Sequence, residues 1–156
     1  MRIIQPKGER GSLKWLQRAV HEAWNDLNEP IVSALRGATA IEWLSPLESD
    51  DFAEYRDNAF LRRLGLDELR PELAKFWPQR GPQWDGLARS ENGHVLLVEA
   101  KAHVGEFCSG PSQASPKSAE HIRSSLIATA RALGVANGLL PDWGRTSTST
   151  PTDWPT

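Results

Sequence analysis

The stretch that decides the fold runs from Trp84 to Lys101 and reads WDGLARSENGHVLLVEAK. Residues 90–93, Ser-Glu-Asn-Gly, form a typical turn sequence between two strand-like segments, so the stretch predicts a β-hairpin. In the second strand both faces are apolar from Val95 to Val98, because side chains alternate between the two faces of a strand. Such a strand is usually central in its sheet and covered by helices on both sides.

The length of the hairpin loop decides which way Asp85 points. A three-residue loop, Glu91–Gly93, opposes Asp85 to Glu99 and sets their two carboxylates on one face, with Cβ atoms about 4.5–5.5 Å apart. A two-residue turn would instead oppose Asp85 to Ala100 and send its carboxylate to the other face. The first register predicts two converging negative charges at the end of the sheet, with Lys101 two residues further along the same face.

Two opposed carboxylates repel each other unless a cation compensates them. Mg²⁺ takes hard oxygen ligands, often from only one or two carboxylates while it keeps water and substrate phosphate oxygens. A nearby ammonium group, here Lys101, can orient the attacking water and balance charge on a reacting phosphate. Asp85, Glu99 and Lys101 therefore have the chemistry that phosphodiester hydrolysis requires.

The rest of the chain predicts helices and one more strand around this hairpin. The fold class expected is α/β, with a sheet and helices packed as an α/β sandwich. Residues 1–143 are expected to form one domain, with an N-terminal helical part at 12–36 and a sheet core at about 38–135. The individual expectations are a helix from Ser12 that ends before Pro30, a strand at 38–44, and helices at 49–64, 66–77 and 118–133.

Composition limits the classes of protein that fit. The chain has 156 residues, a formal net charge of −2 and a single cysteine, Cys108. One domain with its own core is expected from this length, and one cysteine excludes an internal disulfide framework. The sequence has no apolar run of signal-peptide or membrane-spanning length, so a cytoplasmic protein without a membrane partner is expected.

The central stretch resembles a known family. Asp85, followed after a turn by an apolar strand that ends Glu99-Ala100-Lys101, resembles the Asp…Glu-x-Lys signature of the PD-(D/E)xK nuclease superfamily, which has the restriction-endonuclease-like fold. The flanking residues 81–86, Gly-Pro-Gln-Trp-Asp-Gly, strengthen the resemblance, although Trp84 stands where the family name has proline. The resemblance is sharp over residues 76–106 and extends by element order over about 40–135.

The resemblance implies a central mixed sheet flanked by helices. It also implies metal-dependent cleavage of a nucleic-acid backbone, with Mg²⁺ or Mn²⁺ as the cofactor. It assigns Asp85 and Glu99 as metal ligands and Lys101 as the catalytic residue near the attacking water. Many members of the superfamily add a carboxylate from a helix that precedes the hairpin. Glu54 is the candidate for this role, and Asp57 is the alternative.

The expected partner is nucleic acid, with DNA favoured, and no motif that reads bases is visible. Basic residues lie on either side of the hairpin and could follow a phosphate backbone. The alternative function is a catalytically silent protein of nuclease fold that binds nucleic acid or a protein partner, since fold and activity can separate. In a third interpretation the protein is a structural interaction domain, and Asp85, Glu99 and Lys101 form only a surface ion-pair cluster. The basic residues are Arg62, Arg63, Arg70, Lys75, Arg80, Lys117, Arg123 and Arg131.

The last residues, 144–156, are rich in Ser, Thr and Pro and predict a disordered or frameshifted tail. Codons that encode Thr148 to Thr156 can be read one base earlier as Tyr-Gln-Tyr-Ala-Asn-Arg-Leu-Ala-His, which resembles a helical stretch of the superfamily relatives. If that helix is missing, apolar surface is exposed, and weak activity, low stability and association of copies into homo-oligomers are expected.

Overall fold

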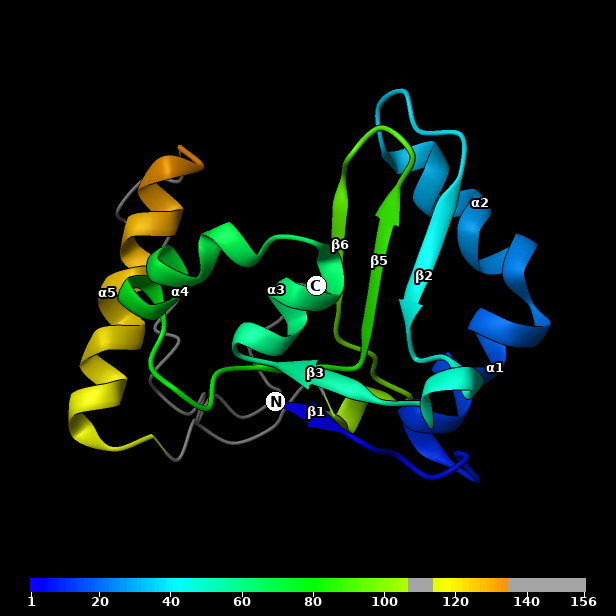
Figure 1. Cartoon of the computed structure of the whole chain (residues 1–156), viewed down its shortest axis with the longest axis horizontal. Helices are drawn as coiled ribbons and strands as arrows, with labels where there is room; N and C mark the ends of the chain where they lie inside the picture. Colours follow the sequence, from blue (N-terminus) through cyan, green and yellow to red (C-terminus); the bar gives the residue numbers. More distant parts are fainter. Residues whose placement is uncertain (107–113, 135–156) are drawn as a thin grey trace, which may run out of the picture.

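The computed structural model describes residues 1–106 and 114–134 and has a mixed α/β architecture (Figure 1). The helices in the described part are α1 (Gly11–Glu22), α2 (Trp24–Ala34), α3 (Asn58–Leu64), α4 (Arg70–Phe76) and α5 (Pro116–Ala132), with short 3-10 turns at Glu48–Asp50, Asp67–Leu69 and Val104–Glu106. The strands are β1 (Arg2–Ile3), β2 (Ile41–Ser45), β3 (Glu54–Arg56), β4 (Gln83–Trp84), β5 (Gly86–Ser90) and β6 (Val95–Val98). The α/β class is thereby confirmed.

The described strands form two small antiparallel sheets instead of the one mixed sheet expected. One has the order β2-β5-β6 and the other the order β1-β3-β4. Strands β4 and β5 are consecutive in the chain, with only Asp85 between them, so the chain passes from one sheet to the other at this residue. The bend at Asp85 is therefore the place where the two sheets meet.

The hairpin has the register that a three-residue loop predicts. Gly86 pairs with Val98 and Arg89 pairs with Val95. Gly93, the last loop residue, has a φ of +90°, in the left-handed region that glycine tolerates best. This register, extended by one pair, opposes Asp85 to Glu99, so the expected loop length is confirmed.

The expectation that the second hairpin strand is covered on both faces is wrong. Val95 and Leu97 of β6 are each 42% exposed, whereas Leu87 and Ala88 of β5 are fully buried. The reason lies in the sheet order, because β5 sits between β2 and β6 while β6 pairs only with β5 among the described strands. Apolar residues on both faces of β6 could not reveal which strand is central.

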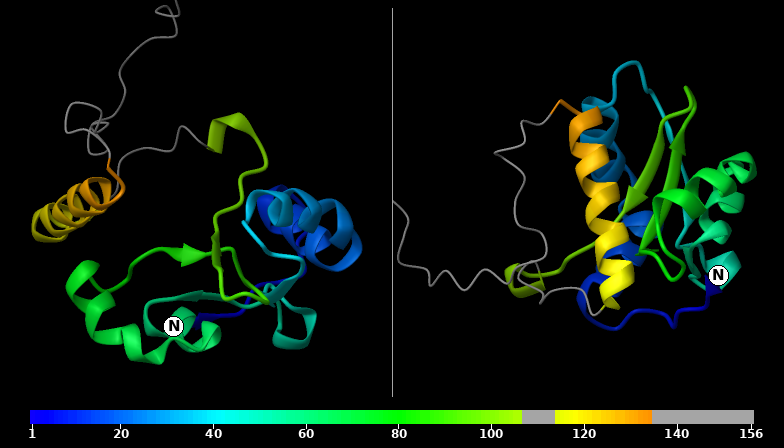
Figure 2. Two further views of the ribbon diagram at one scale, coloured as in Figure 1. Left: turned by 90° about the horizontal axis from the view of Figure 1, so that it is seen from above. Right: turned by 90° about the vertical axis from the view of Figure 1, so that its left-hand side faces the viewer.

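Two apolar clusters lie on opposite faces of β5. Leu87 packs on one face in a cluster with β3 and α3, and Ala88 packs on the other in a cluster with α1 and β2. Figure 2 shows α1 and α2 on one side of the upright strands and α3 on the other. Helix α5 packs on α4, where the Ser125 hydroxyl donates to the carbonyl oxygen of Phe76.

The first predicted helix is two helices. Helix α1 ends at Glu22, α2 begins at Trp24, and α2 continues past Pro30 to Ala34. The interpretation of Pro30 as a stop was wrong. Pro30 has no N–H to donate to the carbonyl oxygen of Asp26, four residues earlier, but Asp26 is exposed, so water can hydrate that oxygen instead.

The helix predicted at 49–64 begins late, at Asn58. Asp51, Phe52 and Asp57 all have positive φ values near +50°, which an α-helix does not allow. Strand β3 lies between Phe52 and Asp57. Periodic apolar residues suggested a helix here, but backbone conformation at these three positions prevents it.

The remaining helix boundaries differ by smaller amounts. The segment predicted as a helix at 66–77 is a 3-10 turn followed by α4, and α5 begins before Ser118, with Ser115 as its cap. The Ser115 hydroxyl oxygen accepts the N–H of Ser118 at 3.3 Å. In the N-terminal helix the cap is Arg10 and not Ser12.

Glu91 ties the hairpin loop to the segment that precedes β2. Its carboxylate accepts the Thr39 hydroxyl at 2.8 Å and the Ala40 N–H at 3.0 Å. These bonds to Thr39 and Ala40 lower the pKa of Glu91 from 4.5 to about 2. The carboxylate therefore stabilises the fold above pH 4.5, and this contribution is lost as the pH falls toward 2.

Glu91→Gln is expected to lower the melting temperature at pH 7, because an amide oxygen replaces only one of the two carboxylate acceptors. The difference from wild type should narrow as the pH falls from about 4.5 toward 2. Thermal unfolding at pH 7 and pH 3 measures this, with the exposed Glu68→Gln as the matched control. A difference that is the same at both pH values would contradict the prediction.

No helix within residues 1–106 and 114–134 is long and apolar enough to cross a membrane. The predictions for residues 144–156, a disordered or frameshifted tail, lie outside the described residues.

Candidate active site

Asp85 joins the two hairpin strands at the end of the sheet. It lies directly after β4 and directly before β5, and its Oδ2 accepts the backbone N–H of Ala100 at 2.7 Å. Beyond Val98 the strand pairing between β5 and β6 ends, so this side chain continues the connection that the backbone ladder no longer makes. The bond holds Asp85 beside the segment that carries Glu99 and Lys101.

Close packing at Gly86 fixes the backbone next to Asp85. A Cβ atom at Gly86 would lie 3.1 Å from Cζ3 of Trp43, 3.3 Å from the Ser45 carbonyl oxygen and 3.4 Å from Cδ2 of Leu16. Gly86 is buried between β2 and α1, which leaves little room for a side chain. The bend that presents Asp85 is thus held by its neighbours on two elements.

Glu99 and Lys101 follow β6 and form an ion pair. The Glu99 side chain is 49% exposed and the Lys101 side chain is 28% exposed, so both can be reached from solvent. Since residues two apart in an extended segment share a face, their pairing agrees with the predicted alternation. The Glu-x-Lys part of the motif is therefore brought together, at the same end of the sheet as Asp85.

Glu54 joins this group from the other sheet. It lies on β3 and is 6% exposed. Burial raises the pKa of Glu54, and the negative charges of Asp85 and Glu99 raise it further, against the opposing effect of hydrogen bonds from two glutamine amides. Asp85 and Glu99 therefore lie close enough to Glu54 to disfavour its charged form. Glu54 was expected on a helix; it stands on a strand because the backbone on either side of β3 is not helical.

The two glutamines that hold Glu54 were not predicted. Gln5 Nε2 donates to Glu54 Oε2 at 2.8 Å, and Gln83 Nε2 donates to the same oxygen. A signal for Gln83 exists in the sequence, since it precedes Asp85 by two residues and so shares its face if the strand is extended. No sequence signal could have found Gln5, which comes from the N-terminal segment.

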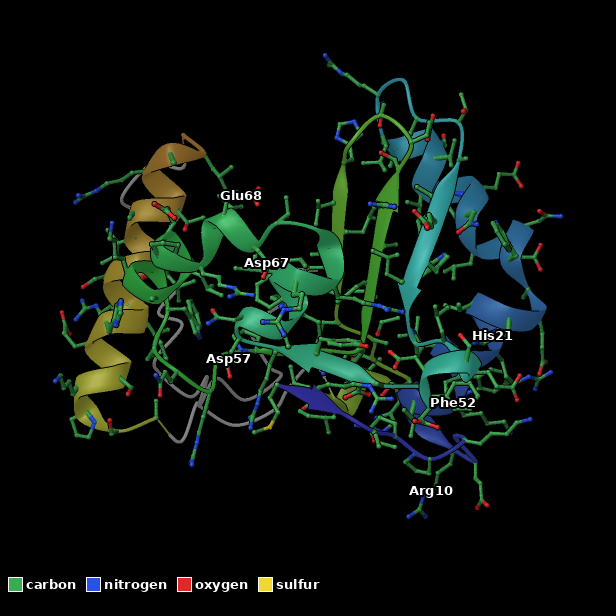
Figure 3. All side chains as sticks on the ribbon, viewed as in Figure 1. Arg10, His21, Phe52, Asp57, Asp67 and Glu68 are labelled. Carbon is green, nitrogen blue, oxygen red and sulfur yellow. The ribbon has the colours of Figure 1, made fainter. Side chains whose placement is uncertain are left out.

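Asp57, the alternative to Glu54, does not join the group. Its Oδ1 accepts the N–H of Gly81 at 3.0 Å, and its Oδ2 lies 3.9 Å from Nε of Arg56. It lies at the start of α3 and secures the turn toward residue 81 (Figure 3). The structure therefore gives Asp57 a role in the turn, and Glu54 remains the candidate.

The side chains of the site supply only part of the ligands that a divalent cation needs. Within the described ranges, no group of three or more His, Cys, Asp and Glu side chains is set to hold a metal ion. Asp85 and Glu99 offer carboxylate oxygens, the donor type that Mg²⁺ and Mn²⁺ prefer. Mg²⁺ commonly takes only one or two protein carboxylates and fills its other positions with water, so this donor set fits such an ion.

The basic residues predicted to follow a phosphate backbone divide into two groups. Arg63 donates from Nε to the Leu44 carbonyl oxygen at 2.9 Å, and Arg62 and Arg70 both pair with Asp67. These three arginines have partners within the protein, although the Arg62 side chain is still 70% exposed. The other predicted cations are exposed, namely Lys75, Arg80, Lys117, Arg123 and Arg131.

Comparison of the chain with protein-family models, with curated proteins and with solved structures gave no match.

Proposed function

We propose that this protein is a metal-dependent nuclease of the PD-(D/E)xK superfamily, with a restriction-endonuclease-like core, that cleaves phosphodiester bonds of nucleic acid, with DNA as the favoured substrate. The observation that carries the proposal is the hydrogen bond from the Ala100 N–H to Asp85 at 2.7 Å, beside the Glu99–Lys101 ion pair. It supports a single site for the three motif residues.

The electrostatics of Glu54 support a cation at this site. Its raised pKa arises first from burial and then from the charges of Asp85 and Glu99, so like-charge repulsion disfavours the charged form of Glu54 there. A group with a raised pKa destabilises the fold as the pH rises through that pKa, because the charged form is disfavoured. A bound divalent cation would relieve this repulsion between the carboxylates.

Each residue has a distinct role in the proposed reaction. Asp85 and Glu99 would hold Mg²⁺ or Mn²⁺, which supplies Lewis-acid stabilisation of charge on the phosphate when bound. The Lys101 ammonium would leave Glu99 to orient the attacking water and balance negative charge on the reacting phosphate. Glu54, with its two amide donors, would keep the Asp85 end of the site polar and fixed.

A second candidate is a binding protein with the same fold and no catalysis. The observation in its favour is that the site partly satisfies itself, since Asp85 accepts the Ala100 N–H and Glu99 pairs with Lys101. The deciding experiment is a cleavage assay with Mg²⁺ or Mn²⁺ on single-stranded DNA, duplex DNA and RNA. Asp85→Asn, purified in parallel, controls for contaminating nucleases, and equal cleavage by both proteins would refute the proposal.

Lys101→Ala is expected to lower the cleavage rate by about a hundredfold, since positioned charge at the transition state typically contributes that much. Metal affinity should stay the same or rise, because Glu99 loses a competing cation. Single-turnover cleavage and calorimetric titration with Mn²⁺ separate the two effects, and Lys101→Arg should restore part of the rate. Undiminished cleavage by Lys101→Ala would overturn its role.

A further inference from the structure

Helix α1 and the segment before it carry basic residues that the proposed site does not use. Lys7, Arg10, Lys14 and Arg18 lie within a short stretch that contains one acidic residue, Glu9, although the whole chain has a net charge of −2. Lys14 and Arg18 are one helical turn apart and share a face of α1, about 6 Å apart along its axis. We name these four residues the α1 basic stripe.

An exposed tryptophan lies within the α1 basic stripe. Trp15 is 57% exposed, with Nζ of Lys14 at 5.3 Å and the guanidinium carbon of Arg18 at 5.6 Å from its ring centroid. Trp15 keeps more than half of its surface exposed, so the ring can be reached by a ligand. Bases of unpaired nucleotides stack on such rings, and adjacent cations attract their phosphates.

The charge of the stripe is largely not neutralised by the protein. Within the part of the chain that the structure describes, Lys7, Arg10 and Lys14 form no ion pair, while Arg18 pairs with Glu22 at 2.8 Å. Arg10 points away from the body of the protein (Figure 3). The stripe therefore presents positive charge that a polyanion could neutralise.

Hydrogen bonds fix the segment that carries Lys7 between α1 and the candidate active site. The buried Gln17 of α1 accepts the Gly8 N–H at 2.7 Å and donates to the Pro6 carbonyl oxygen at 3.0 Å. Just before this segment, Gln5 donates to Glu54 of the site at 2.8 Å. Lys7 is two residues from Gln5, a backbone reach of at most about 7 Å.

Close packing also holds residues 5–8 against helix α1. A Cβ atom at Gly8 would lie 2.5 Å from the backbone nitrogen of Lys14 and 2.6 Å from its Cα. Only glycine allows that approach of two backbones. The start of the stripe is therefore fixed beside the site, and the stripe leads away from it along α1.

We propose that the α1 basic stripe, with Trp15 as a stacking platform, binds single-stranded nucleic acid and guides it to the candidate active site. This inference rests on the proposed nuclease function and specifies its substrate as a strand with unpaired bases. The cations of the stripe contact phosphates, and the Trp15 ring stacks on a base that a duplex would keep inside its own stack.

The test measures binding without cleavage. Fluorescence anisotropy with a labelled oligothymidylate and with a labelled DNA duplex, both in EDTA, gives affinities that do not depend on the metal. Trp15→Ala is expected to weaken single-strand binding by about tenfold and to leave duplex binding unchanged. The matched control is Trp24→Ala on α2, which removes a tryptophan of nearly equal exposure, 55%, and should change single-strand affinity less than twofold.

A second variant tests the charges independently of the tryptophan. Lys14→Gln with Arg18→Gln should reduce the slope of log affinity against log salt concentration by about 1.4 for the single strand, or 0.7 for each lost phosphate contact. Arg36→Gln with Arg89→Gln is the control, because both arginines are exposed and belong neither to the stripe nor to the basic residues predicted to follow a phosphate backbone, and it should leave the slope unchanged. Circular dichroism confirms that each variant is folded.

The outcomes separate this inference from the proposed function. Equal losses of single-strand affinity in Trp15→Ala and Trp24→Ala, or tighter wild-type binding to duplex than to single strand, would overturn the proposed role of the stripe even if the protein cleaves DNA. Binding that depends on Trp15, without cleavage of any nucleic acid in Mg²⁺ or Mn²⁺, would overturn the nuclease proposal alone.

Discussion

Glu99→Gln is expected to lower metal-dependent cleavage by about a hundredfold or more, whereas Glu68→Gln leaves it unchanged. A metal at a reacting phosphate contributes several kcal/mol of transition-state stabilisation, and about 1.4 kcal/mol corresponds to a factor of ten in rate. An amide keeps the size of the side chain but removes the charge that holds the ion. Glu68 is an exposed glutamate on the 3-10 turn before α4, which makes it a matched control for the same chemical change.

Asp85→Asn should produce a loss of similar size while preserving the fold. The asparagine side chain keeps an oxygen that can accept the Ala100 N–H, whereas alanine would leave that donor without its 2.7 Å partner. The choice of asparagine therefore separates loss of metal binding from loss of the connection between the hairpin ends.

A binding readout supports the rate measurement. Mn²⁺ is expected to raise the melting temperature of wild type, since a ligand that binds only the folded state stabilises it. The increase should be absent in Asp85→Asn and Glu99→Gln and retained in Glu68→Gln. Wild-type rates in either variant, or the same metal-dependent increase in all four proteins, would refute the metal site.

The hairpin and its register could be predicted because they depend on local sequence. Loop length and the glycine at position 93 restrict the pairing, which runs from Arg89 opposite Val95 to Gly86 opposite Val98. Asp85 directly precedes β5, and Glu99 and Lys101 follow β6, at the same end of this pairing. Local turn chemistry was sufficient for this part of the site.

The rest of the site depends on contacts between distant segments. Gln5 reaches Glu54 across 49 residues, and no local pattern distinguishes it from other surface glutamines. Glu54 was chosen as a candidate but placed on a helix, since Phe52, Tyr55 and Ala59 suggested helical spacing. The positive φ values around β3 are a tertiary effect, and a sequence pattern does not show them.

Strand order was the main feature of the sheet that the sequence did not determine. Both β5 and β6 contain apolar residues on both faces, and apolarity alone favoured β6 as the central strand. The central position of β5 depends on its pairing with β2, a segment far from the hairpin in the chain. Non-local pairing therefore decides which apolar residues become buried.

Leu87→Ala is expected to destabilise the protein by about 2–5 kcal/mol, since it removes a fully buried side chain and leaves a cavity that its neighbours fill only in part. Leu97→Ala is the matched control, because Leu97 lies directly opposite Leu87 in the hairpin, carries the same side chain and is 42% exposed. Its expected cost is below about 1 kcal/mol, because much of this side chain remains in contact with water in the folded state. Urea denaturation of both variants measures the two free energies of unfolding. Equal losses, or a larger loss in Leu97→Ala, would contradict the burial of β5 between β2 and β6. The bend at Asp85 would then lack its support, since the burial of β5 is what fixes Gly86 beside it.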